Sequence, residues 1–352
     1  MTLNRNVACA LLAAFLFGAS TPMAKRLTGN LAPLLLAGLL YLGSGVGLLL
    51  TRLVRDRRWT PSGLARAEWP WLLGAIVFGG MLGPVALMFG LRHTSSADAS
   101  LLLNLEAVLT ALIAWLAFRE NADRRVVLGM IAIVAGGVAL AWPGSGHRGT
   151  ADLSGAIGPA AIALACLCWG IDNNLTRKVS NADALFIAST KGLIAGGVNT
   201  LLALGLGELP PAADIALFAM LAGLAGYGIS LVLFVLALRG LGAARTGAYF
   251  STAPFIGAAV SLLLLDEPAP PAFWAAAGLM AFGVWLHLTE HHEHDHVHEP
   301  VEHSHPHVHD EHHEHTHAEN EDEKTPHTHW HRHVKLRHRH PHFPDTDHLH
   351  AH

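Results

Sequence analysis

Ten stretches of about twenty mostly apolar residues follow one another in residues 1–289, and they limit the fold more than any other feature of the sequence. A helix of about that length crosses the hydrocarbon core of a bilayer. The stretches occupy residues 7–27, 31–51, 69–91, 98–118, 124–142, 153–176, 183–206, 214–238, 243–265 and 271–289. They are too long and too uniformly apolar for the alternating strands of a transmembrane barrel. The sequence therefore predicts an all-α integral membrane protein with ten transmembrane helices.

Charge divides the chain at about residue 290. Residues 1–289 contain 18 Lys and Arg and 13 Asp and Glu, a balance of +5. Residues 290–352 contain 5 bases, 14 acids and 23 of the 26 histidines, a balance of −9. So few charges in the first part argue against a soluble enzyme, and three cysteines in apolar runs argue against a disulfide framework. We therefore expect a bilayer-embedded body and a polar tail.

The cations predict the orientation of the body in the membrane. If the N-terminus is cytoplasmic, the cytoplasmic loops hold thirteen Lys and Arg and the outer loops hold four. Because cytoplasmic loops carry the excess of cations, we expect both termini in the cytoplasm. Lys25 and Arg26 are exceptions to the rule.

An internal repeat divides the body into two halves. The segment LRHTSSADASLLLNLEAVLTALIAWLAFRE (91–120) aligns without a gap to LRGLGAARTGAYFSTAPFIGAAVSLLLLDE (238–267), with six identities and an offset of 147. The segment FGASTPMAKRL (17–27) aligns to WGIDNNLTRKV (169–179) with an offset of 152. We expect two five-helix repeats, 1–145 and 146–289, followed by the tail, 290–352. Since five is odd, the second repeat would be inverted, an arrangement typical of secondary transporters.

In these features the chain resembles the EamA-type transporters of the drug/metabolite transporter superfamily. The resemblance rests on the two five-span units, on Gly18 and Gly170 near their starts, and on blocks that close in Arg-Glu or Asp-Glu-Pro. The second copy has Pro254 before its fourth apolar run, where the first has Glu106 and Ala107. The resemblance implies a multi-pass exporter in a bacterial inner membrane, driven by a gradient, for amino acids, metabolites or amphipathic drugs.

Ionisable residues inside spans are costly, and they are the first candidates for function. Asp172 and Lys191 lie at similar depths in consecutive spans, so we expect them to pair. The pair would either take part in transport or only hold two helices together. Asn173 and Asn174 offer amides in the same region, and Trp169, one turn away, is a candidate for lining a cavity.

Glu106 is the best candidate for a coupling group, because the sequence places no cation at its depth. A carboxylate in a medium of low dielectric holds its proton more tightly than in water, as a proton-coupled carrier would need. The alternative is a carboxyl that hydrogen-bonds neighbouring backbone or Asn104.

The tail repeats a histidine-rich motif, HHEHDH (291–296) and HHEHTH (312–317), and is nearly free of apolar residues. We therefore expect it to be disordered without a ligand. Neutral imidazoles bind zinc, nickel, cobalt or copper. The candidate metal ligands are His291, His292, His294, His296, His312, His313, His315 and His317. A low-complexity extension with incidental affinity is the alternative.

Two functions remain open from sequence alone. One is a metabolite or amino-acid exporter whose tail buffers or senses divalent metal, and the other is a divalent-cation exporter whose tail collects cytoplasmic metal. The first is favoured because few metal ligands lie inside the spans. No catalytic or Walker motif is present in the sequence, so we expect no enzyme activity, no required cofactor and no nucleic-acid partner. The expected partners are lipid, a small solute and metal ions, and the sequence leaves a homodimer open.

Overall fold

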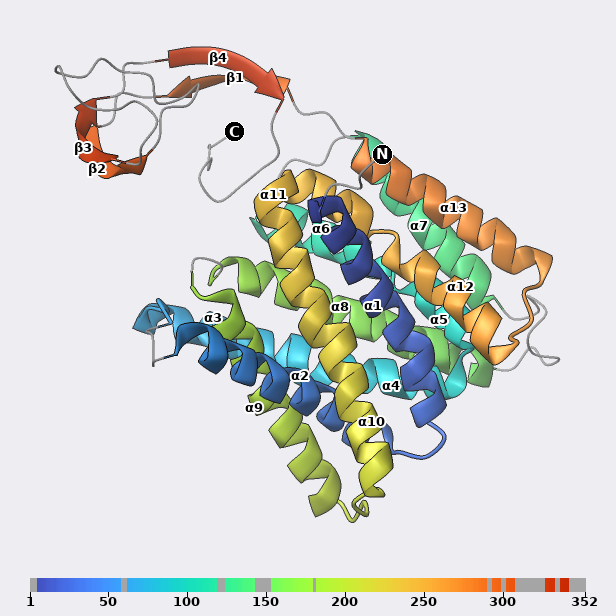
Figure 1. Ribbon diagram of the computed structural model, residues 1–352. Coiled ribbons are helices and arrows are strands. Elements are labelled where there is room, and N and C mark those ends of the chain that lie inside the picture. Colours follow the sequence, from blue (N-terminus) through green and yellow to red (C-terminus); the bar gives the residue numbers. More distant parts are fainter. Residues whose placement is uncertain are drawn as a thin grey trace. The chain divides into compact units, whose positions relative to one another are not determined.

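The computed structural model describes residues 5–57, 62–118, 124–142, 153–179 and 182–289, and four short strands further on. The chain divides into two compact units, Met1–Glu290 and His291–His352. The first is helical (Figure 1). The helical segments of its first half are α1 (Arg5–Leu27), α2 (Pro33–Asp56), η1 (Arg66–Glu68), α3 (Trp69–Ala75), η2 (Ile76–Leu82), α4 (Gly83–His93), α5 (Ser96–Leu102), α6 (Leu105–Phe118) and α7 (Arg124–Ala141). Those of its second half are η3 (Leu153–Ala156), α8 (Ile157–Arg177), α9 (Ala184–Gly205), α10 (Ala213–Gly223), η4 (Leu224–Ile229), α11 (Ser230–Phe250), α12 (Ala253–Leu265) and α13 (Pro271–Leu288).

Nine helical segments within the described residues are long and apolar enough to cross a membrane. The protein is therefore a multi-pass membrane protein. The 21-residue helix α8 is not among the nine. Its polar residues Asp172, Asn173 and Asn174 lower its hydropathy, and it corresponds to the sixth of the ten spans that the sequence predicts.

Small residues bring the helices into close contact. The largest interface joins α2 to α9, where Gly45 faces Gly192 and Gly196 faces Leu42. Further pairs run side by side in Figure 1, namely α7 with α13 and α1 with α11. In the same way α8 packs against α4 and α6, and α1 packs against α12. Because lipid is as apolar as the helix surfaces, such close backbone packing is a main source of association.

The helix boundaries differ from the predicted spans at two places. The segment 98–118 is not one helix, because α5 ends at Leu102 and α6 begins at Leu105 after a turn. In the second half, the expected connection at 239–242 is wrong, since α11 continues to Phe250 and the turn follows at Ser251 and Thr252. Glycines such as Gly240 and Gly242 do not stop a helix, whereas Pro254 is well placed in the first turn of α12.

Two helices contain a wide π turn, η2 between α3 and α4 and η4 between α10 and α11. The N–H of Gly83 donates to Phe78 O, and the N–H of Ser230 donates to Ala225 O, each five residues back. The two turns begin 148 residues apart. Such π turns occur frequently at functional sites.

The described residues of the tail form four short strands. Strand β1 (Glu293–His298) pairs antiparallel with β4 (Leu336–Pro341), and β2 (Glu302–His307) pairs antiparallel with β3 (His327–Arg332). Histidine at every second position is a period-two pattern, which suits a strand even where no apolar core is available. His291, His292, His312, His313, His315 and His317 lie outside the described residues.

Candidate functional site

An ion pair between Asp172 of α8 and Lys191 of α9 lies at the centre of the candidate site, and it confirms the predicted pairing. The other carboxylate oxygen of Asp172 accepts a hydrogen bond of 3.0 Å from Thr176 Oγ1, one helical turn away. The Asp172 side chain is 8% exposed and that of Lys191 is 18% exposed. A pair so poorly solvated is strongly destabilised if one partner is removed.

The π turn of η2 forms the wall against which this pair packs. Gly79 lies directly against the Asp172 side chain. The carboxylate occupies the space that a Cβ at Gly79 would fill. The Gly79 carbonyl oxygen accepts hydrogen bonds from Tyr41 Oη at 2.8 Å and from Trp169 Nε1 at 3.0 Å. In π geometry the backbone donor for this carbonyl would be residue 84, a proline without an N–H. The carbonyl is therefore available to two side chains.

Glu106 lies in the first turn of α6, directly after the break in its span. Its Oε1 accepts a hydrogen bond of 2.9 Å from Asn173 Nδ2, which also contacts Thr110 Oγ1 at 3.2 Å. Asn104 is not the partner of Glu106, as one alternative expected, because its amide donates to Leu101 O at 2.8 Å and caps α5. Asn173 follows Asp172 directly in the sequence, so this hydrogen bond brings Glu106 near the ion pair. The second predicted amide, Asn174, instead donates to the backbone of Gly170 and Thr110.

Aromatic rings extend the site towards α1 and α11. The ring of Tyr41 lies 5.6 Å from that of Tyr227, which lies 6.0 Å from Phe17. The centre of the Phe250 ring lies 5.5 Å from that of Phe17 and 4.8 Å from that of Phe234. Tyr41, Tyr227, Gly79 and Thr110 were not among the residues predicted from the sequence, because their roles depend on which helices pack together. The sequence signal available there is the Gly79/Gly83 spacing, which is typical of close helix packing.

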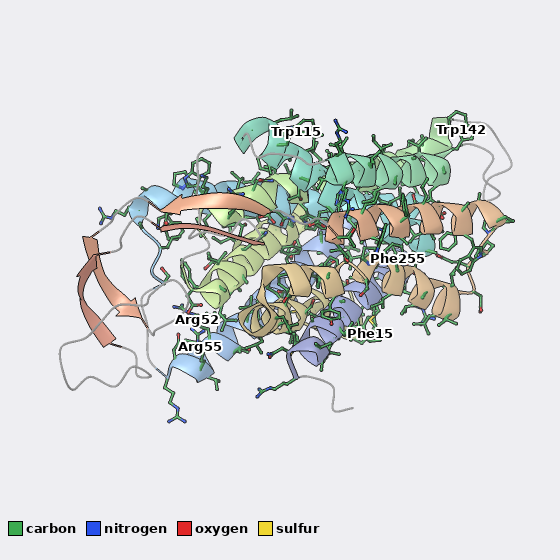
Figure 2. The ribbon with its side chains drawn as sticks, turned by 90° about the horizontal axis from the view of Figure 1, so that it is seen from above. Phe15, Arg52, Arg55, Trp115, Trp142 and Phe255 are labelled. Atoms are coloured by element: carbon green, nitrogen blue, oxygen red, sulfur yellow. The ribbon has the colours of Figure 1, made fainter. Side chains whose placement is uncertain are left out.

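A second charged cluster joins the C-terminal end of α2 to the start of α9. Asp183 caps α9 by accepting from the N–H of Phe186 at 3.0 Å, and it pairs with Arg55 at 2.5 Å and Arg52 at 3.8 Å. Arg52 also lies over the Phe186 ring, 5.1 Å from its centre. Burial alone would raise the pKa of Asp183, but the hydrogen bonds from Arg55 and Phe186 and the arginine charges hold that pKa below its usual range. Figure 2 shows Arg52 and Arg55 close together.

A third polar contact holds the start of α5. Glu267, which follows α12, accepts hydrogen bonds of 2.7 Å from the N–H groups of Ser96 and Ala97. A carboxylate at a helix N-terminus satisfies donors that the helix cannot and interacts favourably with the helix dipole. The contact connects the end of the second repeated block to the start of the interrupted fourth span.

A multi-pass helical bundle with interrupted spans and ionisable groups inside it is the architecture of a membrane transporter. The family model of the EamA-like transporter family matches the chain twice, over residues 5–142 and 156–289. The chain belongs to this family, which is part of the drug/metabolite transporter superfamily.

Three similar proteins are consistent with this membership. An uncharacterized transporter of Methanothermobacter thermautotrophicus is 26% identical over 270 residues, 73% of this chain and 78% of that protein. A probable 4-amino-4-deoxy-L-arabinose-phosphoundecaprenol flippase subunit, ArnE of Pseudomonas aeruginosa, is 40% identical over 114 residues, 31% of this chain and 95% of that protein. One solved crystal structure has the same fold, with a TM-score of 0.58 and 19% identity, covering 80% of this chain and 96% of the other.

Proposed function

We propose that the protein is a secondary, gradient-driven transporter that exports small metabolites or amino acids by alternating access. The observation that carries the proposal is the position of Glu106, in the first turn after a break in a span, where it accepts a hydrogen bond from Asn173, the residue next to Asp172 of the ion pair. Discontinuous helices next to polar groups are the usual construction of substrate and ion sites in such carriers. An ionisable side chain inside a span is energetically costly, and it is therefore a candidate for binding a solute or a proton.

Ten spans in two inverted five-helix repeats are part of the proposal, with α8 as the sixth span. The breaks at Asn104 and Ser251 lie 147 residues apart, as do the aligned blocks. The helix contacts also occur in exchanged pairs, since α1 packs on α11 and α12 while α8 packs on α4 and α6. Exchanged contacts are expected of two repeats related by a two-fold axis, and they support a substrate site between the halves.

The membrane and the orientation belong to the same proposal. A bacterial inner membrane with both termini in the cytoplasm accounts for the distribution of thirteen cations against four in the loops. In this orientation the tail faces the cytoplasm. It would bind zinc, nickel, cobalt or copper there as a buffer or regulator.

A divalent-cation exporter is the alternative, with the tail delivering metal to the body. Among the residues whose side chains the structure describes, no three His, Cys, Asp or Glu come together as metal ligands would. Asp172 is moreover paired with Lys191. These observations favour an organic solute over a metal ion as the cargo.

The proposal is tested by reconstituting the full-length protein in liposomes and imposing a proton gradient on a pool of labelled amino acids and amines. We expect accumulation of at least one solute, and its loss in Glu106→Gln. Glu208→Gln, which removes an equal charge from a loop, is the control and should retain transport. The proposal is wrong if no gradient moves any solute of the pool, or if Glu106→Gln transports as well as the control.

A further inference from the structure

We infer that Glu267 and Lys25 are positioning residues for transport, which hold the short helix α5 closed over one end of the bundle. This inference rests on the proposed transport function and names the side chains that keep one end shut. Helix α5 has seven residues, Ser96–Leu102, and lies between two interruptions of the chain, at residues 94–95 and 103–104. A segment between two interruptions can turn as a unit, because the residues at its ends absorb the changes in φ and ψ.

Charged side chains from two other parts of the chain hold the first end of α5. Glu267 follows α12 and accepts hydrogen bonds of 2.7 Å from the N–H groups of Ser96 and Ala97. Lys25, in the last turn of α1, donates to Thr94 O at 2.8 Å, just before α5 begins. Hydrogen bonds in which one partner is ionised are stronger than those between neutral groups. The first end of α5 is therefore fixed to both α1 and the end of α12.

The same contacts explain the two cations that are exceptions to the charge rule. Lys25 also donates to Leu91 O in the last turn of α4, and Arg26 donates to Leu264 O at 3.0 Å at the end of α12. A cation at a helix C-terminus binds carbonyls that have no partner within the helix, and it interacts favourably with the helix dipole. Lys25 and Arg26 thus join three helix ends at the end of the bundle where Glu267 holds α5.

The second end of α5 leads directly to the candidate coupling group. Only residues 103–104 separate α5 from α6, and Glu106 lies in the first turn of α6. All seven residues of α5 are buried. The helix is about 10 Å long, so a rotation about the turn at 103–104 displaces its first end by several ångströms. Helix α5 therefore connects the contacts of Glu267 and Lys25 to the position of Glu106.

Exposure differs between this end of the bundle and the surroundings of Glu106. Gly158, near the start of α8, lies against His93 and Thr94, so α8 begins at the end that Lys25 and Glu267 hold. Asn173 lies about 22 Å further along α8. It is exposed and donates to Glu106, whereas every residue of α5 is buried. The structure thus corresponds to a state that is closed at α5, and alternating access requires a second state in which α5 opens and the surroundings of Asn173 close.

Hydrogen exchange of the purified full-length protein in nanodiscs tests the role of the two positioning residues. We expect the amides of α5 to exchange about tenfold faster in Glu267→Gln and in Lys25→Met than in the wild type. Asp266→Asn is the control, because it removes the same charge from the adjacent, exposed residue. It should leave α5 as protected as in the wild type.

Thiol labelling tests whether the two regions open and close together. A water-soluble maleimide is applied to Asn173→Cys, alone and combined with Glu267→Gln or Lys25→Met. We expect labelling to slow about threefold or more in the combined variants, because opening at α5 shifts the population away from the present state. A contact with a structural role alone would loosen α5 and leave residue 173 labelled as before. Peptide mass spectrometry separates this label from any on Cys9, the half-buried native cysteine.

The inference is overturned if α5 exchanges faster while labelling at residue 173 is unchanged, or if neither variant alters exchange in α5. If Glu267→Gln does not fold, Ser261→Ala provides a milder change at the same place, since it removes the hydroxyl 2.8 Å from Ser96 Oγ. It should shift both readouts in the same directions, and no shift would overturn the inference. Both measurements are made without solute or gradient. Absence of gradient-driven transport in liposomes therefore contradicts the proposed function and not the coupling between α5 and residue 173.

Discussion

Gly79 and Asp172 are in direct contact, and the absence of a side chain at Gly79 makes room for the carboxylate. The same glycine presents its carbonyl to Tyr41 and Trp169. One residue in the π turn of η2 therefore contacts the ion pair through its Cα and binds Tyr41 and Trp169 through its carbonyl oxygen. This relationship explains why a glycine is needed there although its backbone has no positive φ.

The first prediction is that Gly79→Ala separates Asp172 from Lys191. A methyl group would overlap the carboxylate, so the pair must move or the π turn must shift. We expect a loss of about 1–3 kcal/mol in the free energy of unfolding and a marked loss of transport. Thermal unfolding and liposome uptake measure the two effects. Gly197→Ala is the control, since nothing lies within 4 Å of a Cβ there, and normal transport in Gly79→Ala would contradict the assigned packing.

The second prediction separates transport from helix association at Asp172 and Lys191. Either single neutral replacement, Asp172→Asn or Lys191→Met, leaves one partly buried charge without its partner, at a cost of about 3–5 kcal/mol if fully buried and less here. The double replacement should recover most of this stability, because no charge is left unpaired. We expect the double variant to unfold near the wild-type temperature and yet not to transport. Full transport by the double variant would leave the pair with a structural role alone.

The apolar stretches were sufficient to predict a helical membrane fold, because the length of such a stretch is a local property of the sequence. The Asp172–Lys191 pair was also predictable, since equal depth in consecutive spans brings two side chains together. The interruption at Leu103 and Asn104 was not, because no proline marks it in the first half. There the Asn104 side chain caps α5 through Leu101 O, a hydrogen bond that composition does not specify.

The partners of Glu106 were not predictable from its neighbours in sequence. Asn173 reaches Glu106 from α8, 67 residues away, and this contact depends on which faces of α6 and α8 meet. Apolar stripes do not determine these faces in a bundle where nearly every helix is apolar all round. The role of Gly79 likewise required the position of Asp172 on another helix.

The third prediction concerns the cluster of Asp183, Arg52 and Arg55. Because the pKa of Asp183 is held below its usual range, the folded state favours its ionised form. The resulting stability is fully present above the pKa of the unfolded chain, about 3.9, and is lost as the pH falls through the lower folded value. We expect Asp183→Asn to lower the free energy of unfolding by about 1–2 kcal/mol at neutral pH.

The measurement is the unfolding temperature of wild type and Asp183→Asn as a function of pH. The difference should be largest near neutral pH and should shrink in acid as the wild-type carboxyl is protonated. Asp214→Asn serves as the control, since Asp214 also lies in the first turn of a helix. A difference that does not change with pH would show that Asp183 acts through its shape and not through its charge.

The fourth prediction concerns metal binding by the tail, and the strand register makes it specific. His303, His305 and His307 of β2 are opposite His331, His329 and His327 of β3. Alternate residues of a strand share a face, and directly opposite residues are about 5 Å apart. The register therefore pairs six histidines within a single ladder, and zinc takes four ligands in a structural site. We expect this ladder to bind zinc or nickel more tightly than an equal number of histidines elsewhere in the tail.

Two six-fold variants of the full-length protein test this expectation with matched composition. One replaces the six ladder histidines by alanine, and the other replaces His291, His292, His312, His313, His315 and His317. Competition with a coloured chelator measures zinc affinity in each. The ladder variant should lose about tenfold or more in affinity, and the other variant should lose little. Equal losses would mean that affinity depends only on the number of histidines, and larger loss in the second variant would assign the site to the two repeated motifs instead.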